Sequence, residues 1–417
     1  MQNVLETFSQ ATYFWNGFFA ANSSNTMASL GGISSFGSLR TTGLTNAAFS
    51  YSVGRKAVCV TGLVDVPVIA NTTVVNYPGP ANNFELTEFI TNLARKDTTV
   101  FATYIGGTSQ VSDTFSIFSK LCVPNDVAKA SKLSSIQFLT HGGTTDYNYW
   151  DFSAGYSYVD AAAEQGYATF SYDRLGTGKS EHPDPKQVVQ APLQVDLGHF
   201  LIEKIKTATV GGIRFTSVVG VGHSLGSAIT QGIAAKYPSD FSALTLTGHS
   251  QGSEGGTIGF AAAALQIANT LPDRPELKSL PNAYFSLGPA PQTLQFAFFY
   301  YPFFNTTLFT QEFNTRQTNA IGETLTLGSL YAPATAYTKP VLVLNGLQDY
   351  FYCQGNCLAG GSDTTLAALN ALFPNRDQTK SKAVNIGDLG HNINLHFKRT
   401  EAFGRILTFI TNAGIRP

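Results

Sequence analysis

The sequence predicts an α/β fold in which helices flank a mostly parallel sheet. From about residue 135 onward, short apolar runs typical of buried strands alternate with segments that have helical spacing. This alternation favours parallel strands joined by helical crossovers. The 417 residues can bury a large core, either as one domain with an insertion or as two domains.

The first third of the chain has a different pattern. Residues 1–50 are rich in Ser, Asn, Thr and Gly after an aromatic start, and we expect them to form an extended arm. Residues 84–96 have helical spacing. Alternating runs predict strands, which we assign to an antiparallel section of the sheet, over 56–60, 64–69, 100–105 and 114–121.

The later elements follow in a regular order. Helices are expected over 158–165, where Gly166 marks the end, over 192–206, after residue 224 up to Pro238, and over 398–412. Strands are expected over 135–140, 168–172, 218–221, 243–247, 341–344 and 383–386. Residues 251–337 interrupt this rhythm and are rich in Pro, Gly and aromatic residues. We expect them to form a cap on a core made of 51–250 and 338–417.

The most informative motif is Gly222-His223-Ser224-Leu225-Gly226, between the strand 218–221 and its helix. A G-x-S-x-G motif on a strand-to-helix turn strains the serine backbone and lifts its hydroxyl out of the sheet. A Cβ at position 222 or 226 would collide with the neighbouring strand or helix. The same pattern recurs at 248–252, but a poor helix start follows it, so we interpret Ser250 as a loop serine.

Partners for a nucleophilic Ser224 follow later strands. Asp349 comes after the strand 341–344, and His391 comes after the strand 383–386. Glu254 is an alternative carboxylate. His396 is an alternative base, but we favour His391 because it follows a glycine directly after its strand, whereas His396 falls near the start of the last helix.

The loop after the strand 135–140 begins His141-Gly142-Gly143. Glycine lets the backbone come close to a substrate, so we expect the N–H groups of Gly143 (or Thr144) and Leu225 to bind a developing oxyanion. We expect His141 to brace this loop rather than to transfer protons. The cap aromatics either line the site or form only the core of the cap. Our candidate substrate-contacting residues are His141, Thr144, Tyr147, Trp150, His223, Phe299 and Tyr300.

Composition narrows the function class. The net charge is −1 with 13% charged residues, so nothing favours nucleic acid as a partner, and no apolar run is long enough to span a membrane. Cys353 and Cys357 can close a small loop, and Cys59 and Cys122 can pair. Residues 1–20 do not resemble an intact signal peptide, so a leader would have been removed. Glycosylation sequons and an even cysteine count favour secretion over a cytoplasmic protein with reduced thiols; the sequons begin at Asn22, Asn71 and Asn305.

As a set, these motifs resemble the α/β-hydrolase superfamily, and more narrowly its capped fungal serine hydrolases. The resemblance covers about residues 135–412 and rests on His141-Gly142, 173–180, 222–226, Asp349 with Cys353 and Cys357, and Gly390-His391. It implies an eight-stranded, mostly parallel sheet with a variable cap. The motif over 173–180 ends in Gly-Lys-Ser but is not a P-loop, because Asp173 stands where a P-loop requires a glycine. We interpret Asp173 and Arg174 as a structural pair.

The resemblance also implies a mechanism. Ser224 would be the nucleophile, His391 the base and Asp349 the carboxylate of a hydrolase that cleaves an ester, lactone or thioester of a small apolar or aromatic substrate. No metal or organic cofactor is implied. Alternatives that use the same triad are an acyltransferase and a C–C bond hydrolase. A non-hydrolytic pocket protein that directs a cyclisation is a third. The sequence does not predict the oligomeric state.

Overall fold

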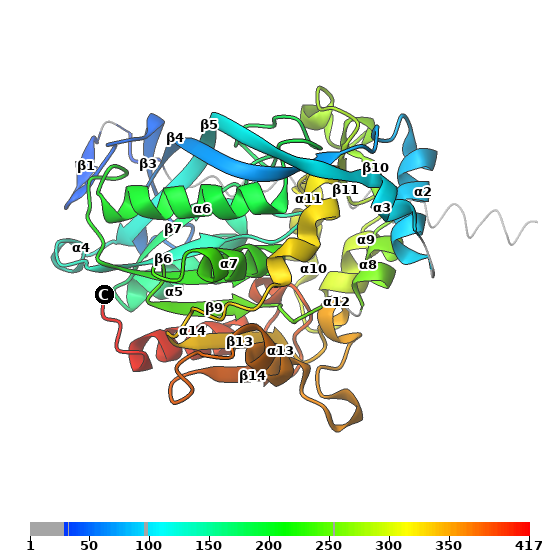
Figure 1. Ribbon diagram of the computed structural model, residues 1–417. Coiled ribbons are helices and arrows are strands. Elements are labelled where there is room, and N and C mark those ends of the chain that lie inside the picture. Colours follow the sequence, from blue (N-terminus) through cyan, green and yellow to red (C-terminus); the bar gives the residue numbers. More distant parts are fainter. Residues whose placement is uncertain (1–28, 32, 96–98, 253–254) are drawn as a thin grey trace, which may run out of the picture.

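The computed structural model describes residues 29–417 except 32, 96–98 and 253–254. Within this part of the chain, nine strands form one twisted sheet at the centre of the molecule (Figure 1). Six neighbouring strands are parallel: β14 (Lys382–Ile386), β13 (Val341–Gly346), β9 (Ala243–Thr247), β8 (Ser217–His223), β6 (Ser135–Thr140) and β7 (Ala168–Tyr172). The predicted α/β fold class is therefore confirmed.

The other three strands extend the sheet in antiparallel fashion. β5 (Ile105–Pro124) pairs with β7 and with β4 (Ala57–Val75), and β4 pairs with β3 (Thr45–Tyr51). The sheet thus has nine strands, one more than the resemblance implies. Because β3 begins at Thr45, the sheet includes the last residues of the predicted arm, while residues 1–28 of that arm lie outside the described residues.

One predicted strand was wrong. Residues 100–105 were assigned to a strand, but Val100–Tyr104 is the short helix α3. The rings of Phe101 and Tyr104 pack around Phe89 of α2 (Asn83–Ala94), with ring centroids 6.0 and 6.1 Å from that of Phe89. The same apolar residues would suit a strand, and this aromatic contact decides in favour of the helix.

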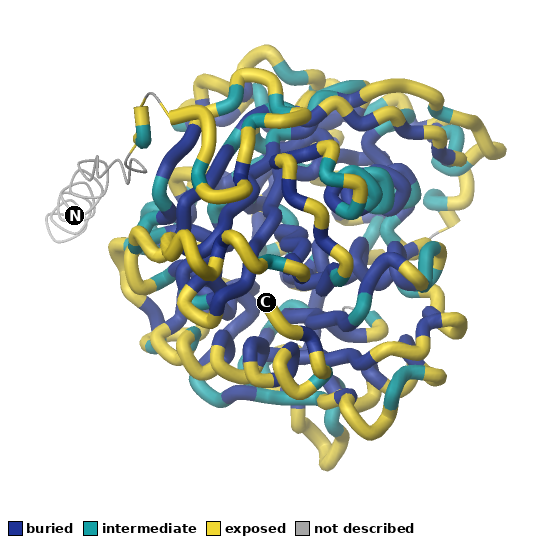
Figure 2. The backbone as a smooth tube through the Cα atoms, turned by 90° about the vertical axis from the view of Figure 1, so that its left-hand side faces the viewer, coloured by how far each residue is buried: buried dark blue, intermediate teal, exposed yellow. Residues whose placement is uncertain are grey.

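Helices cover both faces of the sheet, and the buried backbone is concentrated between these layers (Figure 2). One apolar core contains side chains of α6 (Ala191–Lys206), α7 (Leu225–Lys236) and α13 (Thr364–Leu372). A second core, on the other face, contains side chains of α5 (Tyr158–Glu164) and α14 (Arg399–Asn412). Among the described residues, none of the helices has the length and apolar character needed to span a bilayer.

The cap, defined here as residues 251–337, lies over the carboxyl ends of the parallel strands. A small sheet and four helices form most of it: β10 (Gln266–Ile267), β11 (Tyr284–Ser286), β12 (Asn319–Ala320), α8 (Gly256–Ala262), α9 (Gln292–Phe298), α10 (Thr306–Asn314) and α11 (Ile321–Thr326). Its apolar core also takes in Leu86 and Phe89 of α2. The segment between β4 and β5, for which the sequence indicated no chemistry, therefore packs with the cap (Figure 1). The division into core and cap at 251 and 337 stays a prediction.

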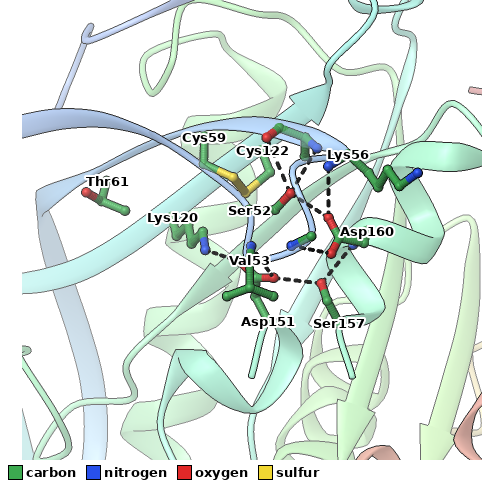
Figure 3. The surroundings of a disulfide bond; sticks show 12 residues. Ser52, Val53, Lys56, Cys59, Thr61, Lys120, Cys122, Asp151, Ser157 and Asp160 are labelled. Atoms are coloured by element: carbon green, nitrogen blue, oxygen red, sulfur yellow. Dashed lines mark hydrogen bonds and ion pairs between the residues drawn. A yellow bond between two sulfur atoms is a disulfide. The ribbon is translucent and has the colours of Figure 1, made fainter. Parts of the chain in front are cut away.

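Two disulfides are present, and they join the cysteines that the sequence pairs. Cys59–Cys122 links directly opposed residues of β4 and β5. Figure 3 shows this bond beside the buried ion pair of Lys120 and Asp151, which ties β5 to the segment after the β6 loop. Cys353–Cys357 closes a short loop after β13.

One helix of the cap carries a buried carboxyl group. Glu312 on α10 is only 5% exposed, and burial, together with the negative charge of Asp146, raises its pKa to about 8. Asp146 caps the 3₁₀ helix η1 (Tyr147–Trp150), and burial raises the pKa of this group as well. Burial and the nearby charge of Asp146 therefore favour a protonated Glu312.

The two disulfides are expected to stabilise the chain unequally. Their sequence separations are 63 and 4 residues, so loop-closure entropy predicts losses of about 4 kcal/mol for Cys59→Ser/Cys122→Ser and about 2 kcal/mol for Cys353→Ser/Cys357→Ser. Urea unfolding followed by circular dichroism measures both losses. Equal losses, or a larger loss for the second pair, would contradict this prediction.

Glu312 should make the stability depend on pH. Its pKa is about 8 in the folded protein against an ordinary value of 4.5, so the folded state retains a proton that the unfolded state releases. The free energy of unfolding of the wild type should fall as pH rises from about 4.5 to about 8. Glu312→Gln should flatten that slope in urea unfolding, whereas Glu88→Gln, which removes an exposed carboxylate, should not.

Candidate active site

Ser224 lies on the sharp turn between β8 and α7, in a left-handed conformation with φ 55° and ψ −122°. The turn is too tight for side chains on either side. A Cβ at Gly222 would lie 2.5 Å from the Cα of Ser227, and a Cβ at Gly226 would lie 2.1 Å from the carbonyl oxygen of Thr140. These contacts explain why both positions need glycine in the motif.

Three side chains from distant parts of the chain meet above the sheet. His391 Nε2 lies 2.8 Å from Ser224 Oγ, and His391 Nδ1 lies 2.7 Å from Asp349 Oδ2. They follow β8, β13 and β14, whose carboxyl ends share one edge of the sheet. His391 and Asp349 are fully buried and Ser224 is 8% exposed, so the contacts are protected from bulk water.

The alternative groups are placed differently. His396 uses both ring nitrogens on the backbone: Nε2 accepts from Tyr300 N and Gly390 N, and Nδ1 donates to the carbonyl oxygen of Asn392. Burial lowers its pKa to about 4. Glu254 lies outside the described residues. Ser250 follows β9, but α8 begins only at Gly256, so in the part of the chain that the structure describes Ser250 is not the residue at a strand-to-helix turn.

The loop after β6 approaches the same point. His141 Nε2 accepts a hydrogen bond from Arg174 N at 3.0 Å, and its Nδ1 donates to the carbonyl oxygen of Gly142 at 2.8 Å. Both ring nitrogens thus brace the loop. Burial and the Arg174 charge lower the pKa of His141 well below its usual value, which keeps the ring neutral. Arg174 does not pair with Asp173; its guanidinium pairs with Glu323 of α11.

The cap holds this loop in place. Thr144 has φ 63°, which is unusual for a residue with a branched side chain. Its carbonyl oxygen accepts a hydrogen bond from Gln317 N at 2.7 Å, and the Gln317 amide donates to Asp146 Oδ2 at 3.0 Å. The Arg174–Glu323 pair is a second tie between the loop region and the cap. The loop conformation therefore depends on contacts with residues 317–323.

A cavity with about 730 Å³ of empty space, its open mouth included, adjoins Ser224. Gly143, Thr144 and Leu225 line it beside the serine. The remaining wall is mostly apolar and comes from the cap and from the turn after β13: Gly259, Phe260, Ala263, Leu265, Phe285, Leu287, Phe298, Leu327 and Phe351. Five further residues bring polar groups to the wall: Asn319, Glu323, Thr324, Tyr331 and Tyr352.

Of the predicted substrate-contacting residues, only Thr144 lines this cavity. His141 braces the loop, as described above. Tyr147 packs against Phe118 with ring centroids 5.0 Å apart, and Trp150 is buried in the second apolar core. Both were assigned to the site because they follow the His-Gly motif, but η1 turns their side chains into the protein interior.

The other three predicted contacts also lie elsewhere. His223 stacks on Tyr149 with ring centroids 4.4 Å apart, beneath the turn. Phe299 packs in the cap core against His396, and Tyr300 is 36% exposed and stacks on Phe303.

Phe298, which precedes Phe299, and Tyr352 line the cavity instead. Neither of them was assigned to the site from the sequence. The helical spacing of residues 292–298 was a signal that could have indicated Phe298 as a residue of the cavity wall. The position of Tyr352 one turn after Asp349 was a usable signal.

The solved structures that are similar to this chain include several hydrolases of low sequence identity. An esterase from Thermogutta terrifontis shares 15% identity at a TM-score of 0.44, over 72% of this chain and 94% of the esterase. Est1E from Butyrivibrio proteoclasticus, solved with ferulic acid, also shares 15% identity at 0.44, over 72% and 96%. A 2-hydroxy-6-oxo-6-phenylhexa-2,4-dienoate hydrolase from Rhodococcus sp. strain RHA1 shares 18% identity at 0.43, over 71% and 94%.

No curated protein sequence matches this chain significantly. A model of the alpha/beta hydrolase family, in contrast, matches residues 138–403, which include Ser224, Asp349 and His391. Because this match spans more than half of the 417 residues, the chain belongs to the alpha/beta hydrolase family and is a hydrolase enzyme.

Proposed function

We propose that this enzyme is a serine hydrolase that cleaves an ester, lactone or thioester bond of a small apolar or aromatic substrate. The observation that carries the proposal is the contact of His391 with both Ser224 and Asp349, at 2.8 and 2.7 Å, beside an apolar cavity. A hydroxyl, an imidazole and a carboxylate in this order are the groups that nucleophilic acyl transfer requires.

In the proposed acylation step, Ser224 Oγ attacks the substrate carbonyl carbon while His391 Nε2 takes the hydroxyl proton. Asp349 accepts the Nδ1–H bond, which fixes the tautomer and stabilises the imidazolium. The electron pair of the carbonyl moves onto its oxygen. His391 then returns the proton to the leaving group, and the tetrahedral intermediate collapses to an acyl-enzyme.

The N–H groups of Leu225 and Gly143 are the proposed oxyanion donors. Both residues line the cavity beside Ser224, and Leu225 is the first residue of α7, where backbone N–H groups lack intrahelical partners. Each donor would lower the barrier by about 3 kcal/mol. Gln317 then has a positioning role, because it holds the loop that carries Gly143.

Acyl transfer to an alcohol is the second candidate. The wall of the cavity is mostly apolar, which favours an apolar alcohol over water as the acceptor of the acyl group. Product analysis with an ester substrate, with and without added alcohol, separates the two reactions. Free acid as the main product under both conditions supports hydrolysis, and a new ester supports transfer.

We also propose that the enzyme is one of the capped fungal hydrolases and is secreted. The motif over 173–180 and the Cys353–Cys357 pair after Asp349 support the first part. Two disulfides and the exposed sequon residues Asn71 and Asn305 support the second. Mass spectrometry of the protein secreted by a fungal host, before and after deglycosylation, tests for the two disulfides and for glycans on the two asparagines.

Ser224→Ala should reduce hydrolysis of p-nitrophenyl acetate by about 10⁴-fold or more, because it removes the nucleophile. Asp349→Asn should lower kcat by about 10⁴-fold, because the amide would hold the imidazole of His391 in the wrong tautomer. Steady-state assays measure both changes, and a fluorophosphonate should label the wild type but not Ser224→Ala.

Ser250→Ala is the matched control, because Ser250 belongs to the second copy of the same motif. It should keep the wild-type rate and the fluorophosphonate label. Full activity in Ser224→Ala would refute the proposed function.

A further inference from the structure

The turn after β13 carries a second functional group besides Asp349. Asp349 caps the short helix α12 (Tyr350–Cys353), and its Oδ1 accepts a hydrogen bond from Tyr352 N at 2.9 Å. The Cys353–Cys357 disulfide closes the turn, and Gly355 N donates back to the carbonyl oxygen of Asp349 at 3.0 Å. The positions of Asp349 and Tyr352 are therefore fixed together.

The Tyr352 side chain is 1% exposed and shares the cavity wall with Ser224. Its ring centroid lies 5.6 Å from that of His391, and its hydroxyl interacts with the Ser224 side chain. On the other side, this hydroxyl lies 3.2 Å from the hydroxyl of Tyr331, the last residue of the 3₁₀ helix η4 (Leu327–Tyr331) in the cap. A chain of hydroxyl groups thus leads from the cap to the serine.

Both phenols remain protonated at neutral pH. Burial raises the pKa of Tyr352 well above its usual value, and the neighbouring Tyr331 and Asp349 raise it further. Burial also raises the pKa of Tyr331. A protonated phenol can donate one hydrogen bond, and Tyr331 can use its own hydrogen to bond the oxygen of Tyr352. This arrangement leaves the Tyr352 hydrogen free to point toward Ser224.

We propose that Tyr352 is a further catalytic residue, whose hydroxyl donates a hydrogen bond to the tetrahedral intermediate formed at Ser224. The inference rests on the proposed acyl-enzyme function. As the bond from Ser224 Oγ to the carbonyl carbon forms, the carbonyl electron pair moves to the oxygen and the serine proton goes to His391. Tyr352 keeps its proton throughout and stabilises the new negative charge, while Tyr331 orients the Tyr352 hydroxyl.

Packing alone does not account for these two hydroxyl groups. Eight phenylalanine and leucine side chains in the same cavity show that this wall can be built without polar atoms: Phe260, Leu265, Phe285, Leu287, Phe298, Leu327, Phe351 and Leu225. A buried hydroxyl loses its hydration and must recover that loss through hydrogen bonds. The contacts of Tyr352 place its hydroxyl at the reacting serine, where a neutral donor stabilises developing charge.

Tyr352→Phe removes only the hydroxyl and keeps the ring. With p-nitrophenyl acetate we expect kcat to fall about tenfold or more, with KM changed less than about twofold, because the lost bond forms only in the transition state. Inhibition by a trifluoromethyl ketone, which forms a tetrahedral adduct with serine, should weaken by a similar factor. Inhibition by acetate, which forms no adduct, should not change.

Tyr167→Phe is the matched control. It also removes a buried phenol hydroxyl, which donates to the carbonyl oxygen of Ile415 at 2.8 Å away from the cavity. This variant should keep the wild-type kcat and ketone affinity. Tyr331→Phe should reduce both by a smaller factor, about threefold, since it only loosens the orientation of Tyr352.

Unchanged kcat and ketone affinity in Tyr352→Phe, with Ser224 still labelled by a fluorophosphonate, would overturn this inference and leave the proposed function intact. If a fluorophosphonate does not label the wild type and Ser224→Ala keeps full activity, the proposed function is overturned instead. If Tyr352→Phe does not fold, judged by its thermal unfolding midpoint, Tyr331→Phe decides. Wild-type kcat and ketone affinity in that variant would then overturn the inference.

Discussion

The tight packing of the turn at Ser224 is the constraint on which the site depends. A non-glycine residue at φ 55° costs about 1–3 kcal/mol, and it persists only where the surroundings enforce it. Here Ser224 N donates to the carbonyl oxygen of Thr247, and Ser227 Oγ donates to the same oxygen. The close contact of Gly226 with β6 fixes α7 against the sheet. The strain is thus balanced by the parallel sheet, which also brings the later loops to the same edge.

Packing of the cap is the second requirement. The cap is not a separate cover, because Gln317 is hydrogen-bonded to the loop after β6. Glu323 pairs with Arg174, which follows β7 and donates to His141 of that loop. Thr144 keeps a left-handed backbone within these contacts. The apolar core of the cap, which includes α2, supports that arrangement from the outside. Core and cap are therefore joined both by the chain and by hydrogen bonds to the loop at the site.

Sequence patterns predicted the core well because its strands are buried on both faces and bounded by turns. The runs at 135–140, 168–172 and 243–247 match β6, β7 and β9 residue for residue. The same reasoning put Ser224, Asp349 and His391 at one sheet edge, because the carboxyl ends of parallel strands must meet there. The contacts between these three residues were not deducible from spacing, since they depend on loops of irregular shape.

The wall of the cavity was harder to predict, and the reason is physical. Phe298 and Phe299 are chemically identical neighbours, but Phe298 is the last residue of α9 and faces the cavity, whereas Phe299 follows the helix in an extended conformation. Trp150 and Tyr147 are apolar enough for either a wall or a core, and η1 directs them to the core. Periodicity assigns residues to faces within one element, but the orientation of an element in the cap follows from long-range packing.

The bond from Gln317 to the carbonyl oxygen of Thr144 also limits how substrate can reach the serine. If the whole cap swung away from the sheet, this edge would detach and the loop after β6 would lose its support. An opening motion that preserves the loop must pivot about residues 317–323 and displace the opposite edge. That edge carries Phe260 of α8 and Phe298 of α9, whose rings face Phe351. It is also held by backbone hydrogen bonds: Asn392 N donates to the carbonyl oxygen of Phe298 at 2.8 Å, and Gly255 N donates to that of Phe351 at 3.1 Å. Opening at this edge therefore breaks these backbone hydrogen bonds but leaves the loop after β6 in place, so substrate entry and the support of the loop depend on different sides of the cap.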